Sequence, residues 1–191
     1  MRRNLFIAIL YTVATTVLLG IGYPLVVTGL AHLFFPARAN GSLIYSTGVL
    51  TGSELLGQPF SGPRYFHSRP SAAGAGYDAS ASGGSNLGPT NQKLIDRISG
   101  DVQALSPEHK GDPVPIDLVT TSGSGLDPDI TPAAAEFQVD TVAHARDLSE
   151  PAVRAAVQRH TLQRQFAIFG EPRVNVLELN RDLDRLNKVP N

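Results

Sequence analysis

The sequence contains no cysteine and has no excess of charge of either sign. The absence of cysteine excludes disulfide bonds, thiolate nucleophiles, and zinc or iron–sulfur sites built on cysteine. The charges balance because 16 Lys and Arg residues stand against 17 Asp and Glu residues. A chain without a basic footprint is a poor candidate for nucleic-acid binding. We therefore expect no nucleic acid among its partners.

Charged residues are also missing from a long N-terminal stretch. There is no Asp, Glu, Lys or Arg from Asn4 to Ala37, and residues 5–35 form a mostly apolar run of roughly 31 residues, whereas about 20 suffice to span a bilayer. A cleaved signal peptide is the alternative, because Arg2 and Arg3 precede the run and residues 37–39 have the Ala-x-Ala form of a cleavage site. The apolar segment of a signal peptide is only about 7–15 residues long, so the length favours an uncleaved membrane anchor.

The charges that flank the apolar run predict its orientation. Arg2, Arg3 and the amino terminus precede it, while only Arg38 follows closely. Positive residues stay on the cytoplasmic side, so the N-terminus should be cytoplasmic. We expect a single-pass protein of the plasma (inner) membrane, with an anchor at residues 1–38 and an extracytoplasmic, periplasmic-side domain at residues 39–191.

Two features within the predicted span bear on its contacts. Pro24, which is flanked by glycines, predicts a kink. Small residues recur at a spacing of four, which places them on one helix face and favours close approach of another helix; they are Ala8, Thr12, Thr16 and Gly20. His32 is the one ionisable residue of the span, so the helix is a poor candidate for an ion pathway.

The first part of the soluble region is rich in turn-forming residues. Short apolar runs at residues 43–45 and 65–66 predict short strands between Gly, Pro and Ser residues. Residues 72–86 are nearly all Ala, Gly and Ser and predict an irregular loop. Such a loop buries little apolar area of its own, so something else must hold it in place.

Helical patterns dominate the second part of the soluble region. Apolar residues fall on one stripe between residues 89 and 105, and Thr131-Pro132 predicts the start of a helix that continues to about Arg146. Ser149 begins a further helical segment that Gly170 closes, residues 174–179 predict a strand, and Asn180 caps a short terminal helix. The predicted class is α/β, of the α+β kind, with a single N-terminal transmembrane helix.

Several polar residues are candidates for chemistry. A catalytic triad can be assembled on paper from Ser122 or Ser124 with His67 and Asp127, but the G-x-S-x-G elbow is missing. Asp127 and Asp129 offer two carboxylates to a cation, although Asp before Pro is more typical of a turn that leads into the Thr131-Pro132 helix.

A glycine-rich loop is the candidate site for an anion or a nucleotide. Its backbone N–H groups precede a predicted helix, where they would cradle a phosphate; the residues are Ser82, Gly83, Gly84, Ser85 and Asn86. No G-x-x-x-x-G-K-[ST] motif accompanies the loop, and the predicted topology places it outside, where ATP is scarce. Packing against partner subunits is the favoured alternative. Arg69 and Arg173 are candidates for charged contacts with neighbouring loops or subunits.

Five sequence motifs occur in a fixed order along the chain: residues 52–58, 65–71, 82–91, 117–130 and 170–180. Together with Gly22-Tyr23-Pro24-Leu25 in the anchor, they closely resemble the C subunit of the bacterial Kdp-type potassium-transporting P-type ATPases. The resemblance covers essentially the whole chain. Ser68 departs from it, because glycine is expected there.

The resemblance implies a non-catalytic accessory subunit of a high-affinity potassium uptake complex. The implied partners are a potassium-channel-like subunit, an ATP-hydrolysing P-type subunit and a very small membrane peptide. No cofactor of its own is implied, and ATP enters only through the loop at residues 82–86, which is also similar to the signature loop of ABC ATPases. The expected interface residues are Ala8, Thr12, Thr16, Gly20, His67, Arg69 and Asp127. The alternatives are a membrane-anchored hydrolase and a solute-binding module.

Overall fold

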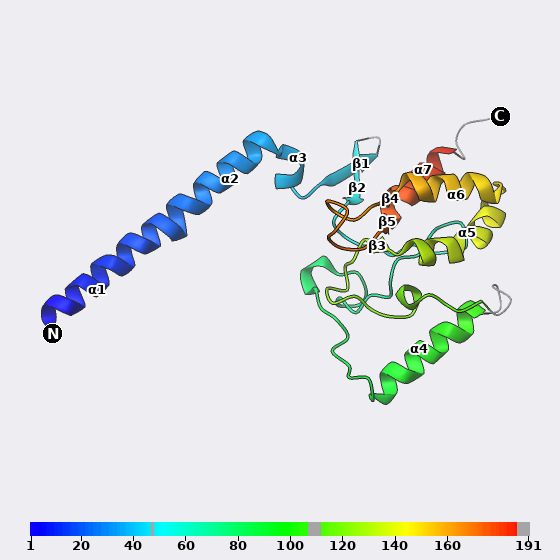
Figure 1. Ribbon diagram of the computed structural model, residues 1–191, viewed down its shortest axis with the longest axis horizontal. Helices are drawn as coiled ribbons and strands as arrows, with labels where there is room; N and C mark the ends of the chain where they lie inside the picture. The colour runs from blue at the N-terminus through cyan, green and yellow to red at the C-terminus, as the bar shows by residue number, and fades with distance from the viewer. Residues whose placement is uncertain (47, 107–111, 187–191) are drawn as a thin grey trace. The chain divides into compact units, whose positions relative to one another are not determined.

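The computed structural model describes residues 1–46, 48–106 and 112–186 (Figure 1). Its contacts divide the chain into two units, Met1–Ser53 and Glu54–Asn191. The described residues contain helices and two small antiparallel sheets, joined in places by long irregular loops. The predicted α+β class with one N-terminal apolar helix is therefore confirmed.

A single long helix forms most of the first unit. It consists of α1 (Arg2–Thr15), the π-helical segment η1 (Thr16–Gly22) and α2 (Tyr23–Phe34). Over Arg2–Phe34 its best window has a mean hydropathy of 2.2, which makes it long and apolar enough to cross a membrane. A kink was expected at Pro24; the structure instead has the π-helical segment η1 just before this proline, and the ribbon continues through it (Figure 1). A wide turn accommodates the proline ring, which would otherwise clash with the preceding turn of an α-helix.

A short helix and a hairpin complete the first unit. α3 (Pro36–Ala39) is followed by β1 (Leu43–Ser46) and β2 (Val49–Ser53), which pair antiparallel with a register shift between Ile44 and Tyr45. The hydroxyl of Ser53 donates to the carbonyl of Gly41 at 2.7 Å and closes the base of the hairpin. The strand predicted at residues 43–45 is confirmed.

Three helices and a three-stranded sheet form the core of the second unit. α5 (Pro132–Arg146), α6 (Glu150–Arg159) and α7 (Val176–Leu186) pack with β3 (Asp129–Ile130), β4 (Thr161–Leu162) and β5 (Arg173–Asn175), in the sheet order β3-β5-β4. The central strand is buried through Val174, which pairs with Ile130 on one side and Thr161 on the other. The buried cluster is mostly aliphatic: Phe66, Leu118, Ile130, Ala134, Ala135, Val139, Val142, Ala143, Val153, Ala156, Val157, Val174, Val176, Leu179 and Leu183.

Local signals explain the position of α5. The hydroxyl of Thr131 accepts a hydrogen bond from the N–H of Ala134 at 3.2 Å, and Pro132 occupies the first turn. At the other end Asp147 adopts a left-handed conformation with φ of 57°, which lets the N–H of Leu148 donate to the carbonyl of Ala143. The helix predicted at residues 132–146 is confirmed.

The next predicted segment was wrong in its second half. α6 begins after Ser149 but ends at Arg159, not near Gly170. Thr161 and Leu162 instead pair with β5, and a hairpin occupies the residues between the two strands. Residues 161–162 therefore pair with the buried central strand β5 and do not continue helix α6.

The boundary between the last strand and the last helix was also wrong. β5 ends at Asn175 and α7 begins at Val176, so Val176, Leu177 and Leu179 lie on a helix and not on a strand. The side-chain oxygen of Asn175 accepts from the N–H of Glu178 at 3.1 Å and fills the capping role predicted for Asn180. The burial of Val176, Leu179 and Leu183 matches helical spacing equally well.

Asn180 has a different role, which explains why Tyr65 and Phe66 do not form the predicted strand. Its side-chain amide accepts from the N–H of Phe66 and donates to the carbonyl of Phe66, both at 2.9 Å. Gln138 does the same for His67, accepting from its N–H at 2.7 Å and donating to its carbonyl at 3.2 Å. Two side-chain amides take the place of a neighbouring strand.

Arg146 completes the support of this segment. Its side chain is fully buried, and Nε donates to the carbonyl of Arg64 at 2.5 Å. The guanidinium also lies 3.0 Å from a carboxylate oxygen of Asp184 and 5.0 Å from the centre of the Tyr65 ring. Residues 64–67, which we call the supported segment, are therefore held by side chains from α5 and α7.

The helix predicted at residues 89–105 is present as α4 (Gln92–Leu105), with the side chain of Asn91 accepting from the N–H of Lys93 at 3.0 Å. None of its residues is buried, in contrast to α5 and α7. Single 3₁₀ turns, η2 (Ala79–Ala81) and η4 (Ile116–Leu118), punctuate the loops on either side.

Replacing Asn180 by alanine should lower the free energy of unfolding of the C-terminal domain by roughly 2–4 kcal/mol, because both main-chain groups of Phe66 lose their buried partners. Arg185→Ala, at an exposed position of the same helix, is the control and should change stability by no more than about 0.5 kcal/mol. Denaturant unfolding of the two purified variants measures the difference. Equal stability of the two variants would contradict the assigned role of Asn180.

Candidate interaction site

Two loops that are distant in sequence form one rigid surface, which we call the loop platform (residues 69–86 and 120–129). Ser71 lies at its centre: its hydroxyl donates to the carbonyl of Gly125 at 2.6 Å and accepts from the N–H groups of Ala73 and Tyr77. The phenol of Tyr77 donates to the carbonyl of Arg69 at 2.6 Å, and burial raises the pKa of this phenol.

The glycine-rich part of residues 72–86 packs directly on the second loop. The N–H of Gly83 donates to the carbonyl of Ser124 at 2.8 Å, and the hydroxyl of Ser82 donates to the same carbonyl at 3.0 Å. Gly125 has φ of +66°, and a Cβ added there would lie only 2.7 Å from both the nitrogen of Ala73 and the carbonyl oxygen of Gly83. The predicted loop is irregular apart from η2, and part of what holds it belongs to the same chain.

One ion pair joins the two loops of the platform, and a second connects the platform to strand β5. A carboxylate oxygen of Asp127 lies 3.4 Å from Arg69, and one of Asp129 lies 2.9 Å from Arg173. Arg69 also donates to the carbonyl of Thr121 at 3.2 Å. Both arginines that were candidates for charged contacts therefore form ion pairs within the domain.

Asp127 forms the turn that was predicted for an Asp before Pro. The side chain of Asp127 accepts from the N–H of Asp129 at 3.1 Å, which forms an Asx turn ahead of α5. Burial raises the pKa of Asp129 in spite of the nearby Arg173, and the charge of Asp127 adds to the rise. Residues 1–46, 48–106 and 112–186 contain no group of three or more His, Cys, Asp or Glu side chains that could hold a metal ion.

The residues of the candidate catalytic triad, His67, Ser124 and Asp127, form hydrogen bonds or ion pairs with other groups. The Nε2 atom of His67 lies 3.2 Å from the carbonyl of Gly62. The hydroxyl of Ser124 accepts from the N–H of Leu126 at 3.1 Å, and Asp127 is paired with Arg69. Activation of a serine nucleophile requires a hydrogen bond from serine to histidine and another from histidine to aspartate. The hydrogen bonds of the described residues do not form this chain.

The loop at residues 82–86 is not at a helix N-terminus. Helix α4 begins only at Gln92, and Asn91 already caps its first turn. The N–H of Gly83 is bonded to Ser124, so this donor is not available to a phosphate. The geometry favours the use of this loop in packing over its use as an anion cradle.

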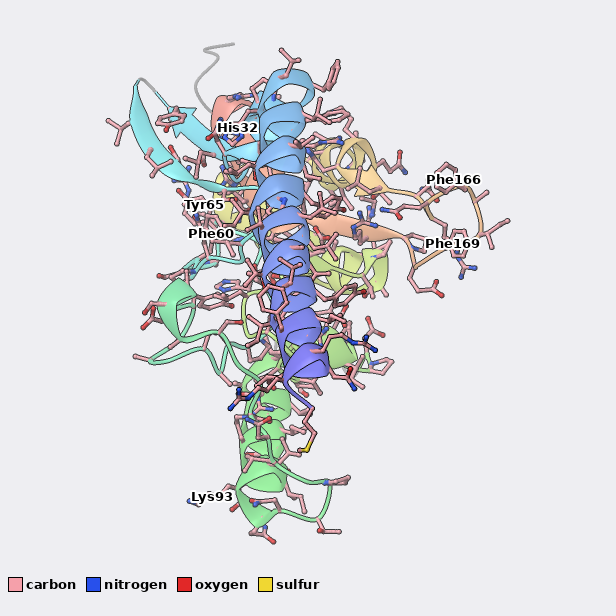
Figure 2. All side chains as sticks on the ribbon, turned by 90° about the vertical axis from the view of Figure 1, so that its left-hand side faces the viewer. His32, Phe60, Tyr65, Lys93, Phe166 and Phe169 are labelled. Atoms are coloured by element: carbon pink, nitrogen blue, oxygen red, sulfur yellow. The ribbon has the colours of Figure 1, made fainter. Side chains whose placement is uncertain are left out.

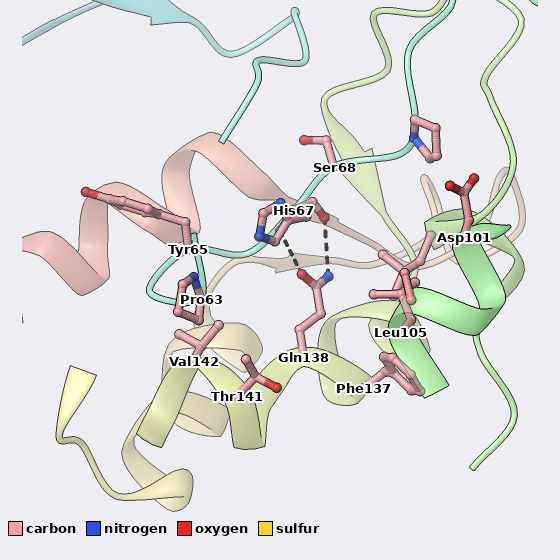
Figure 3. Close-up of a pocket in the computed structure, with 13 residues that line it drawn as sticks. Pro63, Tyr65, His67, Ser68, Asp101, Leu105, Phe137, Gln138, Thr141 and Val142 are labelled. Carbon is pink, nitrogen blue, oxygen red and sulfur yellow. Dashed lines mark hydrogen bonds between the residues drawn. The ribbon is translucent and has the colours of Figure 1, made fainter. Parts of the chain in front are cut away.

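A cavity of about 520 Å³ lies beside the supported segment, between α4 and α5 (Figure 3). His67 and Ser68 line it, and the hydroxyl of Ser68 is buried without a hydrogen-bond partner among the described residues. Sequence reasoning missed the cavity, although it noted that Ser68 replaces an expected glycine. The remaining lining is mostly apolar: Pro63, Tyr65, Pro70, Asp101, Ala104, Leu105, Leu118, Phe137, Gln138, Thr141 and Val142.

The small residues of the anchor are exposed along its helix. Ala8 and Thr12 are one turn apart in α1, and a Cβ added at Gly20 would lie 3.7 Å from the methyl group of Thr16 in η1. Each pair therefore shares a helix face, as predicted. A helix face made of such residues allows close approach of a second helix.

Comparison with known proteins decides the family. A family profile described as "KdpC: K+-transporting ATPase, c chain" matches residues 5–185. The chain belongs to the KdpC family. It is 61% identical over 190 residues to the potassium-transporting ATPase KdpC subunit of Koribacter versatilis, an alignment that covers 100% of this chain and 98% of that protein.

Two further KdpC subunits support the assignment. The protein from Acidobacterium capsulatum is 55% identical over 97% of this chain and 100% of its own length. The protein from Caulobacter vibrioides is 58% identical over 88% of this chain and 86% of its own length. The resemblance found in the loops is confirmed, and the chain is a subunit of a potassium-transporting ATPase complex that contains other subunits.

Gly125→Ala tests whether the loop platform is built as described. The added methyl group meets two backbone atoms and the left-handed conformation is unfavourable for alanine, so the domain should lose roughly 2–4 kcal/mol of stability. Gly123→Ala is the matched control, because a Cβ at Gly123 meets nothing within 4 Å. Denaturant unfolding of both variants measures the effect. A loss at Gly123 as large as that at Gly125 would show that the two loops are not packed in this way.

Proposed function

We propose that the chain is a non-catalytic accessory subunit of an ATP-driven, high-affinity potassium uptake complex. One observation carries the proposal: the KdpC match spans nearly the whole chain while the polar groups of the loop platform are bonded to one another. Groups used in this way shape a surface for binding and are not arranged to attack a substrate. The catalytic site for ATP hydrolysis then belongs to another chain.

The long apolar helix supports a role as membrane anchor in this complex. It carries Arg2 and Arg3 at its start and is followed closely by Arg38 alone. This asymmetry supports an orientation with the N-terminus in the cytoplasm and the domain outside the cytoplasmic membrane. Any effect of the domain on nucleotide affinity is then indirect and passes through contacts with other subunits, not through ATP bound at residues 82–86.

Two surfaces are proposed for assembly. The face with Ala8, Thr12, Thr16 and Gly20 packs against a transmembrane helix of a neighbouring subunit. The loop platform, with Arg69 and Asp127, and the adjoining His67 pack on the outer side of the potassium-channel-like subunit. The ATP-hydrolysing subunit and the small membrane peptide complete the complex. Rigid loops suit this role because little conformational entropy is lost when they bind.

The orientation is tested with a reporter. Alkaline phosphatase fused to the C-terminus should be active, because the enzyme folds only outside the cytoplasm, and the mature chain should retain residues 1–38. An inactive fusion, or a mature chain that begins near residue 40, would overturn the anchor topology.

The accessory role is tested by assembly and uptake together. A strain that lacks this chain should grow poorly when potassium is limiting. Gly20→Leu should reduce recovery of the complex by roughly tenfold, because a bulky side chain separates helices that rely on close packing. Ala14→Leu is the matched control: it adds similar bulk roughly 200° around α1 from Thr12 and should leave recovery unchanged.

ATP hydrolysis distinguishes binding from chemistry in the same complexes. His67→Ala and Ser124→Ala should stay within severalfold of the unmodified complex, whereas loss of a catalytic base or nucleophile typically costs about 10³-fold or more. Normal growth without the chain, or ATP hydrolysis by the isolated chain, would refute the accessory role.

A further inference from the structure

The hairpin between β4 and β5, residues 163–171, carries a cluster of large apolar side chains that contribute nothing to the core. Phe166, Ile168 and Phe169 are 87%, 72% and 63% exposed. Figure 2 shows Phe166 and Phe169 on a loop that projects from the domain. We call residues 163–171 the aromatic hairpin. Exposed apolar clusters of this kind usually mark a site of interaction.

The hairpin is built to hold these side chains outward. Gln165 and Phe169 exchange two backbone hydrogen bonds of 2.9 Å, and Arg164 pairs with Glu171 at 2.6 Å across the base. Phe166 and Ala167 at the tip have φ of 52° and 60°, a left-handed conformation that is unfavourable for residues other than glycine, asparagine and aspartate. A rigid tip in a strained conformation is typical of a functional contact.

We propose that the aromatic hairpin inserts into the lipid headgroup and acyl-chain boundary of the membrane that anchors the chain. The inference rests on the proposed anchor, because the bilayer is the apolar surface that a tethered domain constantly meets. The tether between Phe34 and Glu54 comprises residues 35–53, so the domain stays close to the bilayer. The resulting effective concentration makes even a weak affinity sufficient for binding.

The chemistry of the hairpin fits lipid. Four N–H groups of its tip donate within the hairpin: those of Gln165, Ala167, Ile168 and Phe169. Satisfied backbone groups matter at this depth, because the acyl region offers few hydrogen-bond partners. Arg164 and Glu171 are both exposed at the base, level with where polar headgroups would lie. Phe is among the residues that membrane-surface segments bury at this boundary.

The size of the cluster argues against a protein partner. Its exposed apolar area is on the order of 400 Å², whereas one side of a stable protein interface buries roughly 800 Å². Within the hairpin, Gln163, Arg164 and Gln165 precede the tip and Glu171 follows it, so the apolar cluster of the tip is flanked by polar residues in sequence. A small tip on a tethered domain is sufficient for reversible membrane contact.

The test uses the absence of tryptophan, which makes any introduced tryptophan the sole reporter. Full-length Phe166→Trp is reconstituted into vesicles of phosphatidylcholine and phosphatidylglycerol, with and without bromine on the acyl chains. Bromine quenches tryptophan only at contact. We expect brominated lipid to reduce the emission of this variant by about half, as for a residue at the boundary. Phe169→Trp, reconstituted in the same way, provides a second position on the tip.

Two controls separate the possible failures. Ile116→Trp reports an apolar residue that is 70% exposed elsewhere in the domain and should not be quenched. Leu18→Trp reports the anchor and should be quenched in all cases. If Leu18→Trp is not quenched, the anchor itself is refuted. If it is quenched while both hairpin variants behave like Ile116→Trp, only the lipid contact is refuted.

A protein partner gives a distinct result. The same variants are then measured in the complex with its other subunits, in the same brominated vesicles. Emission at position 166 that shifts to shorter wavelength without quenching would place the tip in an apolar pocket of a neighbouring subunit and overturn the lipid proposal. Quenching that persists in the complex supports it.

Discussion

The C-terminal domain depends on the support that helix side chains give to residues 64–67. Phe66 in this segment is fully buried, yet none of the strands among the described residues pairs with it. Asn180, Gln138 and Arg146 satisfy its backbone instead. A buried backbone without partners would be costly, so these three side chains determine where the segment lies. The segment in turn leads directly to Arg69 and Ser71, so the position of the loop platform follows from it.

The loop platform shows how a sequence that is poor in apolar residues becomes ordered without a core of its own. Ser71 and Gly83 donate hydrogen bonds to backbone carbonyls of the second loop, and Tyr77 donates to that of Arg69 within the first. Gly125 allows the two loops to come into contact. The ion pairs of Asp127 with Arg69 and of Asp129 with Arg173 cancel in charge, and Asp78 adds one exposed negative charge to the platform. A surface with so little charge suits a partner that is recognised by shape.

A structural feature of this domain can be predicted from the sequence when the residues that determine it are close together in the chain. Thr131-Pro132 sets the start of α5 through contacts within one turn, and the length of the apolar run alone predicts the membrane helix. The roles of Asn180 and Gln138 are not local, since their partners lie 114 and 71 residues away. Residues 174–179 were ambiguous because their four apolar positions fit both the strand period and the helix period. The cavity beside His67 depends on how α4 and α5 approach each other, which no short stretch of sequence encodes.

The π-helical segment η1 has a consequence for how the anchor meets its neighbours. Each extra residue that a wide turn accommodates shifts the sequence phase of all later residues by about 100°. The small residues therefore form one line only as far as Gly20, and the positions at a spacing of four beyond Gly22 point in another direction. The anchor thus has two separately oriented halves. One half is available to a closely packed helix, while the other, rich in large apolar side chains, can face a second neighbour or the acyl chains.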